Sequence, residues 1–178
     1  MRVVGGIHRG RILKRVEKPT TRETADMVKV AVFNMLQLTH GIVLDLYAGS
    51  GAYGIEALSR GATFAHFVDM DKDAINIVIE NLKMLKIEHQ AKVYHQTDER
   101  FIKSLKPDAV FDVIFLDPPY DLVNYKDVIE KLITHLNPEG LIVCESKKQI
   151  DIDAKIEGLE KIKDKTYGIK RITIFKKQ

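Results

Sequence analysis

The tetrapeptide Asp117-Pro118-Pro119-Tyr120 directly follows an apolar stretch that ends at Leu116. Two successive prolines fix the backbone φ angles and remove two N–H donors, so this turn is stiff and presents only carbonyl acceptors. The Asp117 carboxylate and the Pro118 carbonyl can each accept one N–H bond from an exocyclic amine, which turns the nitrogen lone pair toward an electrophile and stabilises the positive charge that develops. Tyr120 can stack on the ring that carries the amine, which is worth about 1–3 kcal/mol for a nucleobase. The alternative is a strand-ending turn without chemistry.

A second pattern, Gly49-Ser50-Gly51-Ala52-Tyr53-Gly54, has the spacing G-x-G-x-x-G and is expected to join a strand to a helix. Glycines allow a ligand to approach the backbone closely. Asp69 lies about 20 positions later at the end of the next expected strand, where a carboxylate can accept both hydroxyls of a ribose. The pattern therefore indicates a cofactor that contains a nucleoside. The alternative is that the glycines serve only a tight turn between a strand and a helix.

Asp45, just before the glycine pattern, helps to distinguish between nucleoside cofactors. A dinucleotide would place a pyrophosphate near the helix N-terminus, and a carboxylate would repel it. S-adenosylmethionine (AdoMet) carries a ribose and an ammonium group but no phosphate, so Asp45 favours AdoMet; its alternative role is to brace the loop. Met70 would pack its thioether on the adenine, or fill the core. Asp98 would accept a hydrogen bond from the adenine amine, cap a helix, or do both.

Basic side chains gather at the two ends of the chain. Residues 1–22 carry seven basic side chains against Glu17 alone, a net charge of +6, and residues 155–178 carry +5. Because the whole chain has a net charge of +3, residues 23–154 carry −8. Two basic ends around an acidic body indicate a polyanion such as nucleic acid held at the ends. The alternative is a set of solvated surface charges.

Length and composition exclude several classes of protein. A chain of 178 residues with 45% hydrophobic and 30% charged residues is typical of one globular domain. No apolar run approaches the roughly 20 residues of a membrane span, and the first residues lack the apolar region of a secretory signal. Cys144 is the single cysteine, which excludes an intramolecular disulfide and a Cys-rich zinc site. A single thiol points to a cytoplasmic protein, and because the histidines have no metal-like spacing we expect no metal.

Strands and helices are expected to alternate along most of the chain. Apolar strands separated by helices predict an α/β fold with a parallel sheet covered on both faces, closed by an antiparallel hairpin in the tail. The expected strands are 3–7, 11–16, 42–46, 64–68, 92–95, 110–116, 141–145, 159–167 and 169–176, the first two joined by the basic turn His8-Arg9-Gly10. The expected helices are 24–38, 52–60, 72–86, 98–105 and 124–136.

With these residues identified, the chain resembles class I AdoMet-dependent methyltransferases. More closely, it is similar to the RsmD family, bacterial enzymes that methylate N2 of a guanine in small-subunit (16S) ribosomal RNA. The resemblance covers nearly the whole chain. It rests on Gly5-Gly6, Arg9-Gly10-Arg11, the segment 21–34 ending in Val32-Phe33-Asn34, the runs 44–51 and 56–62, Asp69-Met70-Asp71, Asp117-Pro118-Pro119-Tyr120 and the terminal hairpin.

The resemblance implies two parts. Residues 23–178 would form a Rossmann-like methyltransferase domain with a seven-stranded, mostly parallel sheet whose last strand is antiparallel. Residues 1–22 would form a small basic β-hairpin that grips RNA phosphates, while the guanine leaves its stack to reach Tyr120. The expected residues are Asp117, Pro118, Pro119 and Tyr120 for catalysis, Asp45, Tyr47, Gly49, Ser50, Gly51, Asp69, Met70 and Asp98 for AdoMet, and Arg9, Arg11, Lys14, Arg15 and Arg22 for RNA.

Two departures from the family pattern affect the expected site. Where the family has Arg-Pro-Thr-Thr-Asp-Arg, this chain has Arg22-Glu23-Thr24-Ala25-Asp26-Met27. The family also has an acidic residue near the adenine. This chain has Thr97-Asp98 there, so the alignment leaves open which of the two residues occupies that position.

The substrate would be ribosomal RNA or the assembling 30S subunit, and a monomer is the default expectation. One alternative is an amino-methyltransferase that acts on DNA adenine or cytosine, or on a protein glutamine. The short stretch between Gly54 and Asp117 has no room for a target-recognition domain, and protein-glutamine enzymes have Asn in place of Asp117. A further alternative is an inactive RNA-binding methyltransferase fold.

Overall fold

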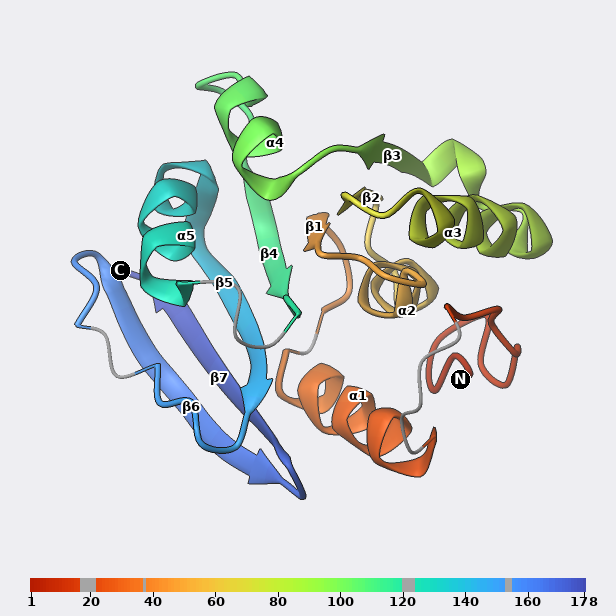
Figure 1. Ribbon diagram of the computed structural model, residues 1–178, viewed down its shortest axis with the longest axis horizontal. Helices are drawn as coiled ribbons and strands as arrows, with labels where there is room; N and C mark the ends of the chain where they lie inside the picture. The colour runs from red at the N-terminus through yellow and green to blue at the C-terminus, as the bar shows by residue number, and fades with distance from the viewer. Residues whose placement is uncertain (17–21, 37, 120–123, 153–154) are drawn as a thin grey trace.

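Alternating strands and helices build one seven-stranded sheet (Figure 1). This computed structural model describes residues 1–16, 22–36, 38–119, 124–152 and 155–178. The strand order is β3-β2-β1-β4-β5-β7-β6; β7 pairs antiparallel with β5 and with β6, and the other pairs are parallel. The strands are β1 (Ile42–Leu46), β2 (Phe64–Asp69), β3 (Ala91–His95), β4 (Phe111–Leu116), β5 (Leu136–Lys147), β6 (Leu159–Tyr167) and β7 (Lys170–Lys177). The mostly parallel sheet with an antiparallel last strand is confirmed.

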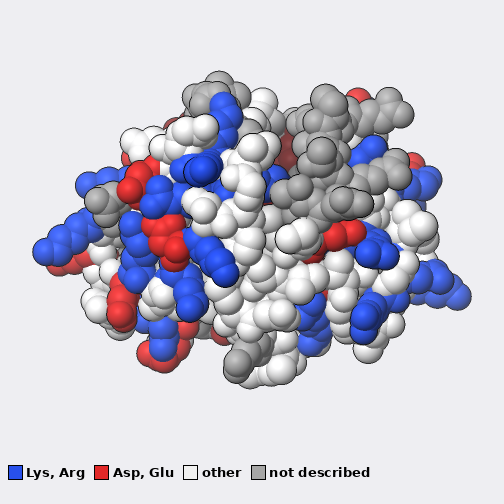
Figure 2. All heavy atoms as spheres, turned by 90° about the horizontal axis from the view of Figure 1, so that it is seen from below, with Lys and Arg blue, Asp and Glu red and all other residues white. Residues whose placement is uncertain are grey.

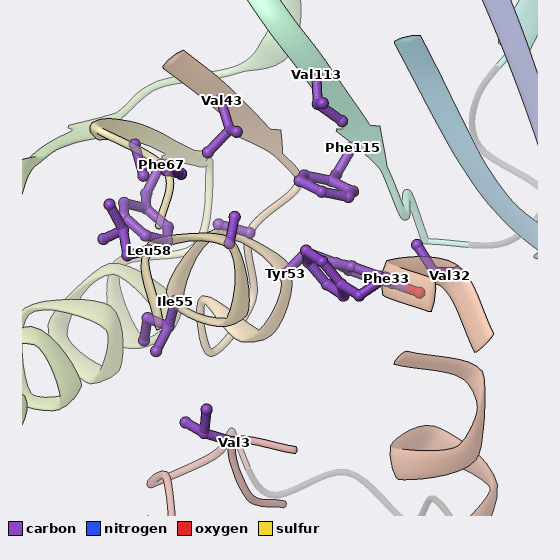
Figure 3. Packing of buried hydrophobic residues seen from close by; sticks show 14 of the residues in the cluster. Val3, Val32, Phe33, Val43, Tyr53, Ile55, Leu58, Phe67, Val113 and Phe115 are labelled. Atoms are coloured by element: carbon purple, nitrogen blue, oxygen red, sulfur yellow. The ribbon is translucent and has the colours of Figure 1, made fainter. Parts of the chain in front are cut away.

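Helices cover both faces of the sheet because successive strand residues point to opposite sides. Val43 and Leu44 of β1, for example, belong to two different apolar clusters. The first cluster packs against α1, α2 and α3 and the second against α4 and α5; Figure 3 shows part of the first, with Phe33, Tyr53 and Phe115 close together. The helices are α1 (Arg22–Leu36), α2 (Ala52–Ser59), α3 (Lys72–Leu85), α4 (Asp98–Ser104) and α5 (Tyr125–Leu132), with 3₁₀ turns at Glu88–Gln90 and Ile133–His135. Among the described residues, none of the helices has the length and apolar character needed to cross a bilayer.

The N-terminal segment, residues 1–16, pairs with itself less than expected. Two strands, 3–7 and 11–16, were expected, but the structure has a single antiparallel bridge between Arg2 and Ile12. The reason is that residues 5–8 bond to α2 instead of to a partner strand. Ile7 N–H donates to the Ser59 carbonyl (2.8 Å), and the Ser59 hydroxyl donates to the Gly5 carbonyl (2.6 Å). The hairpin is therefore short, and its turn lies on the end of α2.

A buried carboxylate joins this segment to two helices. Glu56 of α2 has no exposed surface and accepts a hydrogen bond from Val4 N–H (2.8 Å). It also forms ion pairs with Arg60 (2.8 Å) and with Lys29 of α1 (3.6 Å). Burial lowers the pKa of Lys29, while the charges of Glu56 and Asp26 act in the opposite direction. Because a lone buried charge is very costly, these groups require one another, and the N-terminal segment is docked where they meet.

The expected boundary between the fifth helix and the fifth strand was wrong. The helix was expected to reach residue 136, but α5 ends at Leu132, and β5 begins at Leu136 instead of residue 141. Leu136 pairs with Phe111, the register then shifts so that Val113 pairs with Leu141 of β5, and Asn137 donates to Asp112 (2.9 Å). A strand can contain a proline at such an irregularity, so the Asn-Pro pair does not exclude strand structure there.

Gly6 provides a test of how the N-terminal segment is docked. Its φ is +73°, and an added Cβ would lie 1.7 Å from the Ser59 carbonyl oxygen, whereas Gly10 has φ +87° and open space around its Cβ position. We expect Gly6→Ala to lower the free energy of unfolding well beyond the effect of Gly10→Ala, whose cost is confined to backbone strain of about 1–2 kcal/mol. Urea denaturation of both variants measures the difference, and equal losses would contradict this docking.

Candidate functional site

Two carboxylates from separate sequence motifs, Asp69 and Asp117, meet at the carboxyl edge of the sheet. Leu46 of β1 pairs with Val68 of β2 on one side and with Leu116 of β4 on the other. Asp69 and Asp117 each follow one of these partners, so they lie on either side of the turn that leaves β1. In parallel α/β sheets this edge is where ligands bind. The structure thus brings the glycine pattern, Asp69 and Asp117 together, as the sequence predicted.

The turn between β1 and α2 adopts a backbone that few side chains tolerate. Tyr47, Gly49 and Gly51 all have positive φ, at 72°, 55° and 79°. A Cβ on Gly49 would meet nothing within 4 Å, so its requirement is conformational and its surroundings are open. A Cβ on Gly54 would lie 2.3 Å from the Phe67 ring, so this glycine serves the packing of α2 on the sheet. The first and last glycines of the pattern therefore have different roles.

Asp69 is held in one orientation by backbone donors. Gly49 N–H donates to its Oδ2 (2.8 Å) and Asp71 N–H to its Oδ1 (2.9 Å). Each carboxylate oxygen can accept further hydrogen bonds, so the Asp69 carboxylate is held in one orientation and still has acceptor capacity for a ligand. This is the arrangement required to accept two hydroxyls from one ligand.

A small cavity opens beside Asp69. It is lined by Leu46, Tyr47, Val68, Asp69, Met70, Gln96 and Asp98. Tyr47 donates its hydroxyl to Asp98 Oδ2 (2.6 Å), and Thr97 instead of Asp98 supplies the cap that accepts from Arg100 N–H at the start of α4. Met70 is 69% exposed, so it does not fill the core. The alternative predictions, that Asp98 caps a helix and that Met70 fills the core, are therefore wrong. Both residues border the cavity.

Gln96 also lines this cavity, although it belongs to none of the motifs in the sequence. Its Oε1 is buried and has no hydrogen-bond partner among the described residues. A buried polar atom without a partner is costly, so this oxygen indicates a missing donor. Its position at the end of β3, next to Thr97-Asp98, was the only signal available in the sequence.

Asp45 braces the turn from below. It is 2% exposed, and Gly54 N–H donates to its Oδ2 (2.9 Å). Burial raises the pKa of Asp45 to about 7; the bond from Gly54 opposes this shift and the charge of Asp69 adds to it. The bracing role is thus confirmed. Its predicted contact with an ammonium group stays a prediction, and its charge changes near neutral pH.

The Asp-Pro-Pro turn follows β4 at the same edge. Asp117 is half-buried, Pro118 is buried and Pro119 is exposed, whereas Tyr120 lies outside the described residues. Next to this turn, Glu145 of β5 follows Cys144, the partner of Leu116.

Glu145 is buried, and its carboxylate is already engaged. Tyr53 donates its hydroxyl to Glu145 Oε2 (2.6 Å), and Lys170 of β7 forms an ion pair with Oε1. Burial raises the pKa of the Tyr53 hydroxyl, and the nearby charges of Glu145 and Asp117 raise it further. The hydroxyl therefore stays a neutral donor. Glu145 therefore supports the structure next to Asp117, and its carboxylate is not available to a ligand.

The basic residues of the N-terminal segment differ in how free they are. Arg9 and Arg11 are exposed and have no ion-pair partner among the described residues. Lys14 is exposed but bonds Glu80 (2.9 Å), and Arg15 is half-buried. The Arg22 side chain lies outside what the structure describes. Figure 2 shows Lys and Arg side chains on both sides of one face, toward the β6–β7 hairpin, where Asp and Glu lie among them, and toward the N-terminal segment.

A larger depression of about 490 Å³ lies away from these carboxylates. It is bordered by Gly6, Ile7, the end of α2, the residues before β2, and Gln90. None of the candidate site residues lines it, so we place the site at the carboxyl edge, where the oriented acceptors converge. Within the described residues there is no group of three or more His, Cys, Asp or Glu side chains that could hold a metal ion.

Comparisons with known proteins agree with this architecture. The family model described as "Conserved hypothetical protein 95" matches residues 1–176. The "Putative rRNA methyltransferase YlbH" of Bacillus subtilis is 39% identical, with all of both chains covered. The "Ribosomal RNA small subunit methyltransferase D" of Haemophilus influenzae is 36% identical over 95% of this chain and 90% of its own. The solved structure of the "Putative methyltransferase yhhF" from Escherichia coli superposes with a TM-score of 0.88 at 28% identity, covering 100% of this chain and 98% of that one. The chain therefore belongs to the family described as Conserved hypothetical protein 95, the RsmD family that its motifs resemble.

Proposed function

We propose that this protein transfers a methyl group from AdoMet to the exocyclic N2 amine of a guanine in 16S ribosomal RNA. The observation that carries the proposal is the convergence of Asp45, Asp69 and Asp117 on the carboxyl ends of adjacent strands. The Bacillus subtilis relative is named as an rRNA methyltransferase and the Haemophilus influenzae relative as a methyltransferase of the ribosomal RNA small subunit, which supports ribosomal RNA as the substrate class.

The residues at the edge of the sheet fit AdoMet in three ways. Asp69 is oriented to accept the two ribose hydroxyls, and Gly49 leaves its side of the turn open. The buried Gln96 oxygen lacks a donor, which an adenine amine would supply beside Asp98. Asp45 would neutralise the ammonium group. When bound, AdoMet supplies a methyl group already activated by its sulfonium, so the contribution of the protein is to position the reactants.

On the substrate side, Asp117 and the Pro118 carbonyl accept the two N–H bonds of the guanine amine. These bonds orient the nitrogen lone pair toward the methyl group, and Asp117 stabilises the positive charge that develops on the nitrogen. Tyr120 stacks on the base. Lys170 and Tyr53 occupy both oxygens of Glu145, so this neighbouring carboxylate is not available to the amine.

Asp117→Ala should abolish turnover, with a loss of at least about 100-fold, because the amine loses an oriented acceptor. The affinity for AdoMet should stay within several-fold, since Asp117 faces the base. The assay uses radiolabelled AdoMet with bacterial small subunits that lack the modification, followed by nucleoside analysis.

The wild-type enzyme should place the label in N2-methylguanosine. Asp127→Asn, on the exposed side of α5, is the matched control and should be fully active. Normal turnover by Asp117→Ala would refute the mechanism, and label in methyladenosine or methylcytidine would refute the guanine target.

The pKa of Asp45 predicts how cofactor affinity depends on pH. The carboxyl of the free protein has a pKa of about 7, so at lower pH it must lose a proton before it can pair with an ammonium group. The affinity for S-adenosylhomocysteine, which keeps that ammonium, should therefore rise as pH increases from 5.5 to 7.5. Asp45→Asn should bind more weakly and lose this rise. Calorimetric titrations at several pH values measure both proteins, and identical pH profiles would show that Asp45 does not face the ligand.

Arg9 and Arg11 should act on RNA alone. Reversing both to Glu removes two phosphate contacts, so the KM for the small subunit should rise at least about tenfold and its salt dependence should decrease. The affinity for S-adenosylhomocysteine should not change. The charge-matched control reverses Lys126 and Lys131 on α5, on the other face of the sheet. If RNA methylation survives the first reversal intact, the N-terminal segment does not hold the RNA.

A further inference from the structure

Asn81 of α3 connects two parts of the chain that have different proposed ligands. It has no exposed surface. Its Oδ1 accepts from Lys14 N–H (2.8 Å), and its Nδ2 donates to the Lys14 carbonyl (2.9 Å) and to the Ser50 carbonyl (3.0 Å). Both donors of the amide and its oxygen are thus engaged. One side chain therefore bonds the N-terminal segment and the centre of the glycine turn.

The Ser50 carbonyl is a sensitive place for such a bond. Ser50 lies between Gly49 and Gly51, both with positive φ, and the neighbouring Gly49 N–H is the donor that orients Asp69. A change in how the Ser50 carbonyl is held would therefore reach the carboxylate proposed to bind the ribose. Gly51 N–H bonds the Ala48 carbonyl (2.7 Å) across the turn, and Asn81 supplies a side-chain donor to the Ser50 carbonyl that lies between them.

The N-terminal segment has other attachments, which makes the Asn81 bonds separable. Val4 bonds Glu56, and Ile7 and His8 bond Ser59. The exposed ion pair between Lys14 and Glu80 contributes little, because both groups are well solvated. Loss of the Asn81 bonds alone should therefore leave the segment docked at its other end, with Arg9 and Arg11 still in place.

We propose that Asn81 is a positioning residue that couples RNA binding at the N-terminal segment to cofactor binding at the glycine turn. The inference rests on the proposed function for the identity of the two ligands. RNA that holds the segment in its docked position stabilises Lys14 against Asn81, and Asn81 in turn holds the Ser50 carbonyl in the form that binds the cofactor. By linkage, bound cofactor must raise RNA affinity by the same factor.

The first test is a binding cycle on the wild-type protein. The dissociation constant of S-adenosylhomocysteine is measured alone and with saturating deproteinised 16S ribosomal RNA, and that of the RNA alone and with saturating S-adenosylhomocysteine. We expect each ligand to tighten the other at least fivefold, by equal factors. If each ligand binds but its dissociation constant is the same with and without the other ligand, the coupling is refuted. Failure of either ligand to bind by itself overturns the proposed function instead, and the coupling with it.

The second test assigns the coupling to Asn81. Asn81→Asp keeps the acceptor for Lys14 N–H but loses the donors to the Lys14 and Ser50 carbonyls. It should reduce the coupling ratio to near one, with RNA affinity in the absence of cofactor unchanged within about twofold. Asn81→Ser is measured in the same way, so that misfolding of the first variant does not decide the result. Glu80→Gln, which removes only the ion pair to Lys14, should keep the wild-type ratio. A folded Asn81 variant that is less stable but retains the full ratio would show a purely structural role.

Discussion

Three backbone polar groups of the turn between β1 and α2 are bonded by side chains, and much of the site follows from these bonds. Its left-handed residues interrupt the regular ladder: Tyr47 and Gly51 N–H still find backbone acceptors, whereas side chains bond the groups between and beyond them. Asp69 accepts from Gly49 N–H, Asn81 donates to the Ser50 carbonyl, and Asp45 accepts from Gly54 N–H. An unpaired buried group would cost about 1–3 kcal/mol, so each partner stabilises the fold. Residues proposed to bind the cofactor are thus also residues that form its loop.

The same helix that begins at this turn ends at the N-terminal segment. Glu56 and Ser59 of α2 provide bonding partners for the backbone of residues 4–8, and the charge of Glu56 is balanced by Lys29 and Arg60. The segment consequently needs no long strand pairing of its own. Its basic side chains are free to face outward because its backbone is held from the inside.

Sequence patterns predicted the elements whose bounds are marked by residues of the segment itself. β1 and β6 have the expected bounds, and α2 differs by one residue, because apolar runs and glycines mark these segments. The N-terminal strands and the start of β5 were misjudged because their bonding depends on distant partners, Ser59 and Asp112. The site shows the same limit. Motif spacing identified Asp69 and Asp117, whereas the orphan oxygen of Gln96 and the burial of Glu145 depend on side chains that meet only in the folded chain.

The charge balance of this edge explains why its ligands would be separated in space. Asp69 is compensated by backbone N–H groups, Asp98 by Tyr47, and Glu145 by Lys170, whereas burial leaves Asp45 with a pKa near 7 and one backbone donor. Such an edge favours a cation and disfavours phosphate. A cofactor with an ammonium and a sulfonium fits it, and an RNA backbone does not. The exposed Arg9 and Arg11 lie on a different segment, so the proposed arrangement holds the phosphates there and admits only an uncharged base to the acidic edge.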